Sequence, residues 1–324
     1  MAILDPNFAC FTQPSWLHHP PHQWQAGTLD RAALHDAAGR LLSTDGFDAA
    51  CKGFAENTLA TYGENQQALN KIMREAPRFA LMAFVMYLHH HRGRGEPGVT
   101  YTRVKEIFAL GSRSGVLATP TRIKAMFGLA KMAGQLRPAV PAAADKRMRV
   151  LEPTGKFIEP AQVWLRGCLE AVARAAPLIQ SPAELIATPG FLGEVMSYNV
   201  HAYMHDGFIL YEELPPIKLM MSRENGYLTL MEMLRSLRCV DGVWQARAPS
   251  VALARRFAMA RGTIRNLLEY GEQQGWLRVA ARGGHALMLS EEFATVCRRW
   301  VALEIVWTAG FANAAAVRLN PNVS

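Results

Sequence analysis

The strongest constraint on the fold of this 324-residue chain is a pattern of residues that occurs twice, 141 positions apart. In both copies, apolar residues stand at i, i+3, i+4 and i+7, the spacing that places them on one face of a helix. These stripes consist of Ile123, Met126, Phe127 and Ala130 in the first copy and of Ile264, Leu267, Leu268 and Gly271 in the second. At the same offset, Gly134, Leu136 and Arg137 correspond to Gly275, Leu277 and Arg278. Each helix is therefore predicted to end at a glycine and to continue through an apolar residue into a strand.

The elements predicted around the two copies follow the same order, which favours an internal duplication over a chance match of two amphipathic helices. Around the first copy, we predict helices over 77–91 and 101–110, a helix that opens at Thr119-Pro120, a strand over 147–151 and a helix over 157–176. Around the second, we predict helices over 226–238, 250–257 and 261–274, two strands within 278–289 around Gly283-Gly284, and a helix from Ser290 to 309. Further helices are predicted over 28–42, 48–62, 64–74 and, with breaks, 182–213.

These predictions describe a mainly α fold with small β-hairpins. We divide it into an N-terminal arm with helices over 1–62, a first domain over 63–180 and a second domain over 181–324.

A helix, a tight turn, a second helix with polar residues at its start and then a β-hairpin is the plan of a winged helix-turn-helix. The clearest example is the segment 250–264, in which Leu253 and Phe257 are expected to face the core and Ala254 to allow a close helix crossing. This segment resembles the MarR-like winged-helix regulators of bacteria, in which a small-apolar stretch, Leu-Ala and a basic pair precede the turn and a Thr-Val/Ile helix. The resemblance extends over some 40 residues in the second half and is weaker in the first. It implies a tandem of two winged helix-turn-helix domains in one chain.

Two departures from that pattern stand out. Ala260 occupies the position at which such motifs usually carry a capping Ser or Thr. The first unit also has the longer turn, since Ile107 and Ile123 are 16 positions apart, whereas Leu253 and Ile264 are 11 apart.

Residues expected to contact DNA lie on the second helix of each unit and on the hairpins. Arginine can bind a guanine edge through two hydrogen bonds and asparagine an adenine edge, while hairpin cations suit phosphates. The candidates are Thr121, Arg122 and Lys124 on the first helix, Arg261, Thr263, Arg265 and Asn266 on the second, and Lys146, Arg147, Arg149, Arg278, Arg282 and His285 on the hairpins. The alternative is that these side chains are ordinary solvated charges on helix faces.

Composition agrees with a polyanionic partner in a reducing compartment. The net charge is +8 and the pI is 9.4, which modestly favours nucleic acid. Five cysteines stand far apart without a CxxC pair, which favours the cytoplasm over a secreted disulfide framework. We see no signal peptide, and the segment 79–88 is too short to span a bilayer. We therefore expect a cytoplasmic protein at the nucleoid.

Other features are assigned to structure rather than to chemistry. No nucleophile, zinc-protease or phosphate-loop motif occurs, so we expect no enzyme activity and no cofactor. We also expect no metal site at 89–91 or 18–22, because consecutive histidines on a helix point in different directions. The polar segment 198–213 is interpreted as a helix surface, with an effector pocket between domains as the alternative.

The long helices at 157–176 and 290–309 carry large apolar residues such as Trp164 and Trp300. The resemblance implies that they pack against each other, so that one chain imitates a dimer; ordinary core within each domain is the alternative. Our leading hypothesis is a sequence-specific regulator of transcription that binds double-stranded DNA, with a small effector or a protein as a further partner. The alternatives are a plasmid-type replication initiator and a winged-helix protein-interaction module, with an enzyme the least supported.

Overall fold

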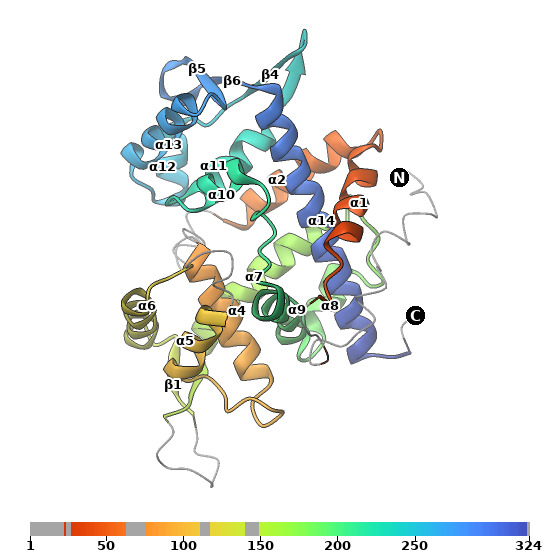
Figure 1. The fold of residues 1–324 in the computed structure, drawn as a ribbon, viewed down its shortest axis with the longest axis vertical. Helices are drawn as coiled ribbons and strands as arrows, with labels where there is room; N and C mark the ends of the chain where they lie inside the picture. The colour runs from red at the N-terminus through yellow and green to blue at the C-terminus, as the bar shows by residue number, and fades with distance from the viewer. Residues whose placement is uncertain (1–22, 24–26, 63–75, 111–116, 140–148, 323–324) are drawn as a thin grey trace.

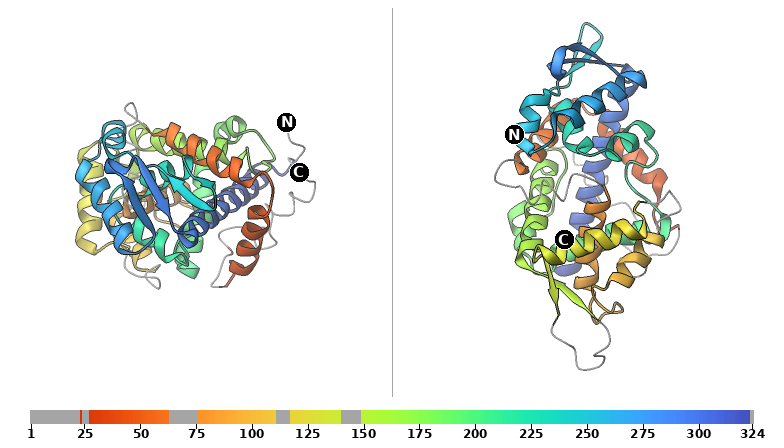
Figure 2. Two further views of the ribbon diagram at one scale, coloured as in Figure 1. Left: turned by 90° about the horizontal axis from the view of Figure 1, so that it is seen from above. Right: turned by 90° about the vertical axis from the view of Figure 1, so that its left-hand side faces the viewer.

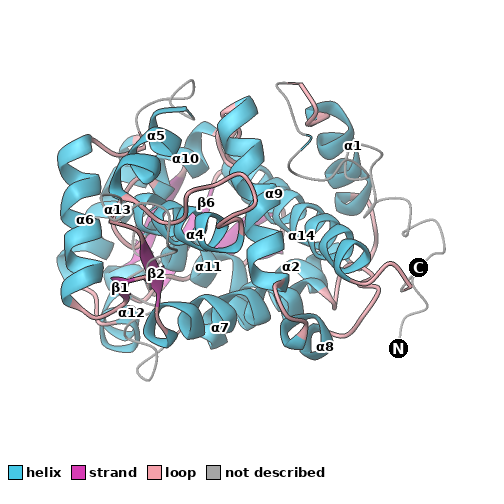
Figure 3. Cartoon of the chain, turned by 90° about the horizontal axis from the view of Figure 1, so that it is seen from below, coloured by secondary structure: helices cyan, strands magenta, loops and turns pink. Residues whose placement is uncertain are grey.

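The computed structural model describes residues 23, 27–62, 76–110, 117–139 and 149–322 (Figure 1). The described residues form a mainly helical fold with two small antiparallel sheets, and Figure 3 shows how short the strands are beside the helices. This confirms the predicted fold class in its coarse form. Residues 1–22 and 24–26 of the predicted N-terminal region and the helix predicted over 64–74 lie outside the described residues.

The first two helices pack on elements that come later in the chain, and the second of them contacts both halves. Helix α1 (Arg31–Leu42) is capped by Asp30, whose carboxylate accepts a hydrogen bond of 2.9 Å from the Ala33 amide. It packs on α14 (Glu291–Leu319). Helix α2 (Phe47–Thr61) packs on both α7 (Gly155–Val172) and α11 (Gly226–Arg235). At Gly167 of α7, an added Cβ would lie 1.8 Å from Thr61 Oγ1, so only glycine permits this approach.

The first half continues with α4 (Ala76–His90), α5 (Tyr101–Leu110), α6 (Pro120–Met132), β1 (Leu136–Pro138), β2 (Leu151–Pro153) and α7. Thr119 caps α6, as predicted, by accepting a hydrogen bond from the Arg122 amide at 3.3 Å, and Pro120 occupies the first turn. β1 pairs antiparallel with β2. On the other side of β2, Val99 forms a bridge with Leu151.

The second half contains α11, β3 (Arg238–Val240), β4 (Val243–Ala246), α12 (Ser250–Phe257), α13 (Arg261–Gln273), β5 (Leu277–Ala281), β6 (Ala286–Leu289) and α14. Its sheet has the order β3-β4-β6-β5, so β4 lies beside β6 as Val99 lies beside β2. The hairpin β3–β4 was not predicted, and the helix predicted to reach 238 ends at Arg235. Asp241 and Gly242 both have positive φ, 50° and 76°, which is the signature of a two-residue hairpin turn that the Asp-Gly pair could have indicated.

Helices α6 and α13 have the same length, 13 residues, and the same bounds at the 141-residue offset. Their buried residues are the two predicted stripes. The exits also agree. Gly134 and Gly275 have φ of 67° and 72°, and the residue after each donates a hydrogen bond to the stripe's last residue, Gln135 to Ala130 at 2.9 Å and Trp276 to Gly271 at 3.0 Å.

A second backbone hydrogen bond is shared where each hairpin returns. The Thr154 amide donates to the Gln135 carbonyl, and the Ser290 amide donates to the Trp276 carbonyl, both at 2.9 Å. Thr154 and Ser290 are the N-cap residues of α7 and α14, so each hairpin leads directly into a long helix.

Three helices connect the halves: α8 (Pro182–Ala187), α9 (Phe191–Asp206) and α10 (Pro215–Met221), the last of which was not predicted. Helix α9 packs on α4 and α14. The prediction of a helix surface at 198–213 is therefore wrong for α9, where Tyr198 and Tyr203 are buried. Helix α9 belongs to the predicted second domain but packs on α4 of the first, so the two halves are interlocked. The domain boundary at residue 180 stays a prediction.

Helix α14 runs ten residues beyond its predicted end at 309, to Leu319, and forms the axis of the molecule (Figure 1). It contacts α7; the pseudo-dimer stays a prediction. Its length and composition would allow it to cross a membrane, but 78% of its most apolar window is buried inside the protein. This burial is consistent with a core helix of a soluble protein.

Candidate nucleic-acid interface

Helices α6 and α13 lie on one side of the molecule. The right-hand view of Figure 2 looks at this side and shows α6 in its lower half and the α12–α13 pair in its upper half. The hairpin of β1 and β2 lies at the lower end, and the strands β4, β5 and β6 lie at the upper end. Because the apolar stripes of α6 and α13 are turned into the core, their polar residues face solvent on this side.

The N-terminal half of α13 carries four of the predicted contact residues. Arg261, Arg265 and Asn266 are exposed, and Thr263 is half-buried. The Arg265 guanidinium lies 3.3 Å from the Glu269 carboxylate one turn later, and both side chains are more than half exposed. An ion pair so exposed contributes little, so Arg265 can exchange this partner for a base or a phosphate at small cost.

The matching surface of α6 carries basic but no acidic side chains. Thr121, Arg122 and Lys124 are exposed, and no acidic residue occurs within the helix. Lys124 corresponds to Arg265 at the 141-residue offset. A lysine offers a compact charge rather than a planar fork, which suits a phosphate better than two acceptors on one base.

Of the two hairpins, the second is described over its whole length. In the second, Arg278, Arg282 and His285 are exposed, and Gly283 and Gly284 turn the chain with φ of 71° and 77°. An added Cβ at Gly284 would lie 2.2 Å from the Ala248 carbonyl, which restricts this position to glycine. Across the hairpin, Arg278 lies 2.6 Å from Met288 Sδ.

The first hairpin is described only at its base. Arg149 is exposed there, whereas Lys146 and Arg147 lie outside the described residues.

One cation beside α13 was not predicted. Arg223, in the connection between α10 and α11, packs its guanidinium 4.2 Å from the centre of the Tyr270 ring. It lines a surface hollow together with Thr263 and Asn266. No local pattern marks Arg223 as part of the interface, because its position follows from how the connection between α10 and α11 packs beside α13.

The basic pair Arg255-Arg256 divides between two roles. Arg255 is exposed. Arg256 donates a hydrogen bond of 2.7 Å to the Leu59 carbonyl and so joins α12 to α2. The sequence alone could not predict which of the two arginines packs on α2, because that contact joins residues far apart in the chain.

Away from this side, the histidines at the end of α4 converge on α9, contrary to the prediction that they point apart. His90 Nε2 lies 3.1 Å from Glu194 Oε2, and His91 Nε2 lies 2.7 Å from Ser197 Oγ. The side chains of His90, His91 and Glu194 bring their ligand atoms within 4.8 Å of one another, a separation that a metal ion could bridge. Arg318 already lies 2.7 Å from Glu194 Oε1 in an ion pair without hydrogen-bond alignment.

The protonation states of this cluster suit a structural role, in which buried ion pairs hold three helices together. Burial opposes the ionisation of Glu194, but the hydrogen bond from His90 and the charge of Arg318 outweigh it and lower the pKa of this carboxyl. Burial lowers the pKa of His91 to about 4, so its ring is neutral at pH 7. The result is a buried carboxylate held by Arg318 and His90, which joins α4, α9 and α14.

No family profile, curated protein or solved structure matches the chain.

Proposed function

We propose that this chain binds double-stranded DNA through two winged helix-turn-helix units related by an internal repeat, and that it regulates transcription. The first unit comprises α4, α5, α6, β1 and β2, and the second comprises α11, β4, α12, α13, β5 and β6. The observation that carries the proposal is the placement of α6 and α13. They have equal lengths, equivalent buried stripes and equivalent exits, and they lie on one side of the molecule between two outward hairpins.

This placement suits a duplex that runs along that side. Recognition helices of paired winged units enter successive major grooves, one helical turn apart, while the hairpins reach flanking phosphates. In a homodimer the two helices are identical, and the DNA site is a palindrome. Here Lys124 stands where the second unit has Arg265, and Ala125 stands where it has Asn266. The proposed site is therefore asymmetric, with base readout concentrated in the half that α13 contacts.

The charges on this side favour the same conclusion. The exposed cations of α6 lack acidic neighbours within the helix. In α13 the arginines stand in the N-terminal half, and Glu269 and Glu272 follow in the C-terminal half. Glu272 accepts a hydrogen bond of 2.7 Å from the Val279 amide, which ties it to β5 rather than to the outer surface. Glu269 pairs with Arg265 at 3.3 Å, and DNA would have to displace this exposed partner.

The experiment is a selection of bound sequences from random duplexes with the purified chain, followed by anisotropy titrations at several salt concentrations. We expect one non-palindromic consensus. Arg265→Ala is expected to relax base preference at positions in one half of it. Arg282→Ala is expected to weaken binding to all duplexes alike and to reduce the slope of log K against log salt by about 1. Equal binding of the wild type to every duplex, or no binding, would overturn the proposal.

Arg40→Ala supplies the control. Arg40 is exposed in the last turn of α1, on the opposite side from α6 (Figure 1). The substitution removes the same charge and should leave both the consensus and the salt slope close to those of the wild type.

A further inference from the structure

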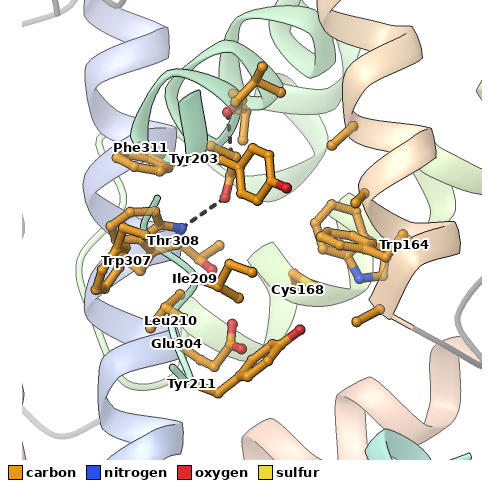
Figure 4. Close-up of a pocket in the computed structure, with 18 of the residues that line it drawn as sticks. Trp164, Cys168, Tyr203, Ile209, Leu210, Tyr211, Glu304, Trp307, Thr308 and Phe311 are labelled. Atoms are coloured by element: carbon orange, nitrogen blue, oxygen red, sulfur yellow. Dashed lines mark hydrogen bonds between the residues drawn. The ribbon is translucent and has the colours of Figure 1, made fainter. Parts of the chain in front are cut away.

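A second candidate site lies inside the molecule, where the two halves meet. A chamber with a volume of about 160 Å³, partly open to solvent, is lined by α4, α7, α9 and α14, with the segment 207–211 along one side. Figure 4 shows its side chains pointing inward from these elements. A cavity of this size holds roughly one aromatic ring, since an engineered cavity of about 150 Å³ binds benzene.

The walls of the chamber are mainly aromatic. Phe79 and Trp164 meet edge to face at 4.8 Å between ring centres, and Trp307 packs against Phe311 at 4.2 Å and Phe208 at 5.1 Å. Polar atoms of the wall are largely satisfied by the protein itself. The Tyr203 hydroxyl donates to the Phe108 carbonyl at 3.0 Å, and Trp307 Nε1 donates to the Asn199 side chain at 2.9 Å.

One charged group is the exception. The Glu304 carboxyl faces the chamber beside the Tyr211 ring (Figure 4). Its Oε1 accepts a hydrogen bond of 3.1 Å from Trp300 Nε1, and its Oε2 has no hydrogen-bond partner among the described residues. No lysine, arginine or histidine is among the described residues that line the chamber. Burial raises the pKa of Glu304 to about 7, as expected for a carboxyl without a cation.

We propose that this chamber binds a small lipophilic amine, with its apolar body between the aromatic rings and its ammonium group against Glu304. A carboxylate ligand would meet a like charge, with no cation among the described lining residues to offset it. A neutral apolar ligand would fill the space but leave Glu304 Oε2 without a donor, and an alcohol would supply a hydrogen bond but no opposite charge. A protonated amine supplies the donor and the opposite charge, and the neighbouring ring of Tyr211 offers a favourable face to a cation.

The test compares three probes of nearly equal size: 2-phenylethylamine, 2-phenylethanol and phenylacetate. Binding is measured at pH 8 by calorimetry and by the fluorescence of Trp164 and Trp307 in the wall. We expect the amine to bind about 10- to 100-fold more tightly than the alcohol, the range for one hydrogen bond to a buried charge, and the acid to bind most weakly. Equal affinities for the three probes, or no binding of any at millimolar concentration, would overturn the proposal.

Two variants separate charge from shape. Glu304→Gln preserves the size of the side chain, and it should lose the preference for the amine while it still binds the alcohol. Ala80→Leu narrows the chamber and should weaken the binding of both the amine and the alcohol. The melting temperature of each variant shows whether it is folded. Unchanged amine affinity in Glu304→Gln would refute the role of the carboxylate. These measurements contain no DNA, so their outcome is independent of the proposed DNA binding.

Discussion

The two proposed winged units agree in their cores and differ at their edges. Both place a 13-residue helix with the same buried positions against a hairpin, and both close that hairpin with the same pair of backbone hydrogen bonds. They differ in the strand beside the hairpin, which is a single bridge at Val99 in the first unit and the strands β3 and β4 in the second. They also differ in the sequence separation between their two helices, which is longer in the first unit, and in the cap of the second helix.

This difference separates two kinds of constraint. A buried stripe is constrained by close packing on every side, so few changes are tolerated. An exposed helix start or hairpin tip contacts only solvent in the free protein. If the units arose by duplication, their outer residues were free to diverge toward different DNA contacts while the stripe was retained. Under the proposed function, the difference between Lys124 and Arg265 would then give the two helices different DNA contacts, and the shared stripe would keep both helices folded in the same way.

Truncation of the shared stripe should have the largest effect. Ile123→Ala and Ile264→Ala each remove a fully buried side chain at equivalent positions, and each should cost about 2–5 kcal/mol in the free energy of unfolding. Because α9 and α2 interlock the halves, we expect each variant to unfold in one transition in urea, followed by circular dichroism. Two separate transitions would show that the units fold independently, which would contradict the interlocked arrangement of the halves.

The carboxyl between the units should make stability depend on pH. The pKa of Glu304 is raised from 4.5 to about 7 by burial, so the folded state binds the proton more tightly than the unfolded state. Its stabilising contribution is complete below pH 4.5 and is lost as pH rises toward 7, by on the order of 3 kcal/mol. The groups that interact with it electrostatically, Tyr62, Cys168, Tyr211 and Tyr227, stay neutral in this range because burial raises the pKa of each.

Glu304→Gln removes this dependence. Urea titrations at pH 5 and pH 8 should therefore show the wild type losing stability relative to the variant as pH rises. Parallel curves for the two proteins would contradict the assignment of the raised pKa to Glu304.

The equivalent positions on the outer surfaces should differ in their effect on DNA. Arg265→Ala is expected to cost about 1–3 kcal/mol at the selected duplex and less at unrelated duplexes, as for loss of a contact to one base. Lys124→Ala should weaken the selected and unrelated duplexes by similar factors, as for loss of a phosphate contact. Anisotropy titrations on both duplexes measure the ratio. Equal loss of specificity in the two variants would mean that both helices read bases.

The caps of α6 and α13 provide the smallest and most symmetrical test. Thr119→Ala removes the side-chain cap of α6, and Ala260→Ser introduces one at α13, where no side chain caps the helix. We expect a loss and a gain of about 0.5–2 kcal/mol, respectively. Thermal melts of the two variants and of the double variant measure both effects. A loss of stability in Ala260→Ser would show that the two helix starts are not equivalent.

Local pattern was sufficient for much of the fold. The stripes of α6 and α13, the cap at Thr119, the bounds of α5 and α12 and the second hairpin at Gly283-Gly284 all follow from residues within one or two turns of each other. The exposure of Arg261, Arg265 and Asn266 follows from the same period, because residues outside the stripe face away from the core. Two elements that local signals should have indicated were missed: the β3–β4 hairpin around the loop at Asp241-Gly242, and α10, which begins at a proline pair.

The rest depends on contacts between residues that are far apart in sequence. Helical periodicity shows that a face is buried but does not name its partner, so the sequence could not place α9 against α4 or α1 against α14. The convergence of His90 and His91 on Glu194, the packing of Arg223 beside α13 and the chamber around Glu304 exist only after those helices meet. The sequence by itself determined the elements and their buried faces, because these depend on backbone geometry and local spacing. Tertiary structure alone decided which faces meet, because burial is non-directional and many pairings of apolar faces satisfy the same pattern.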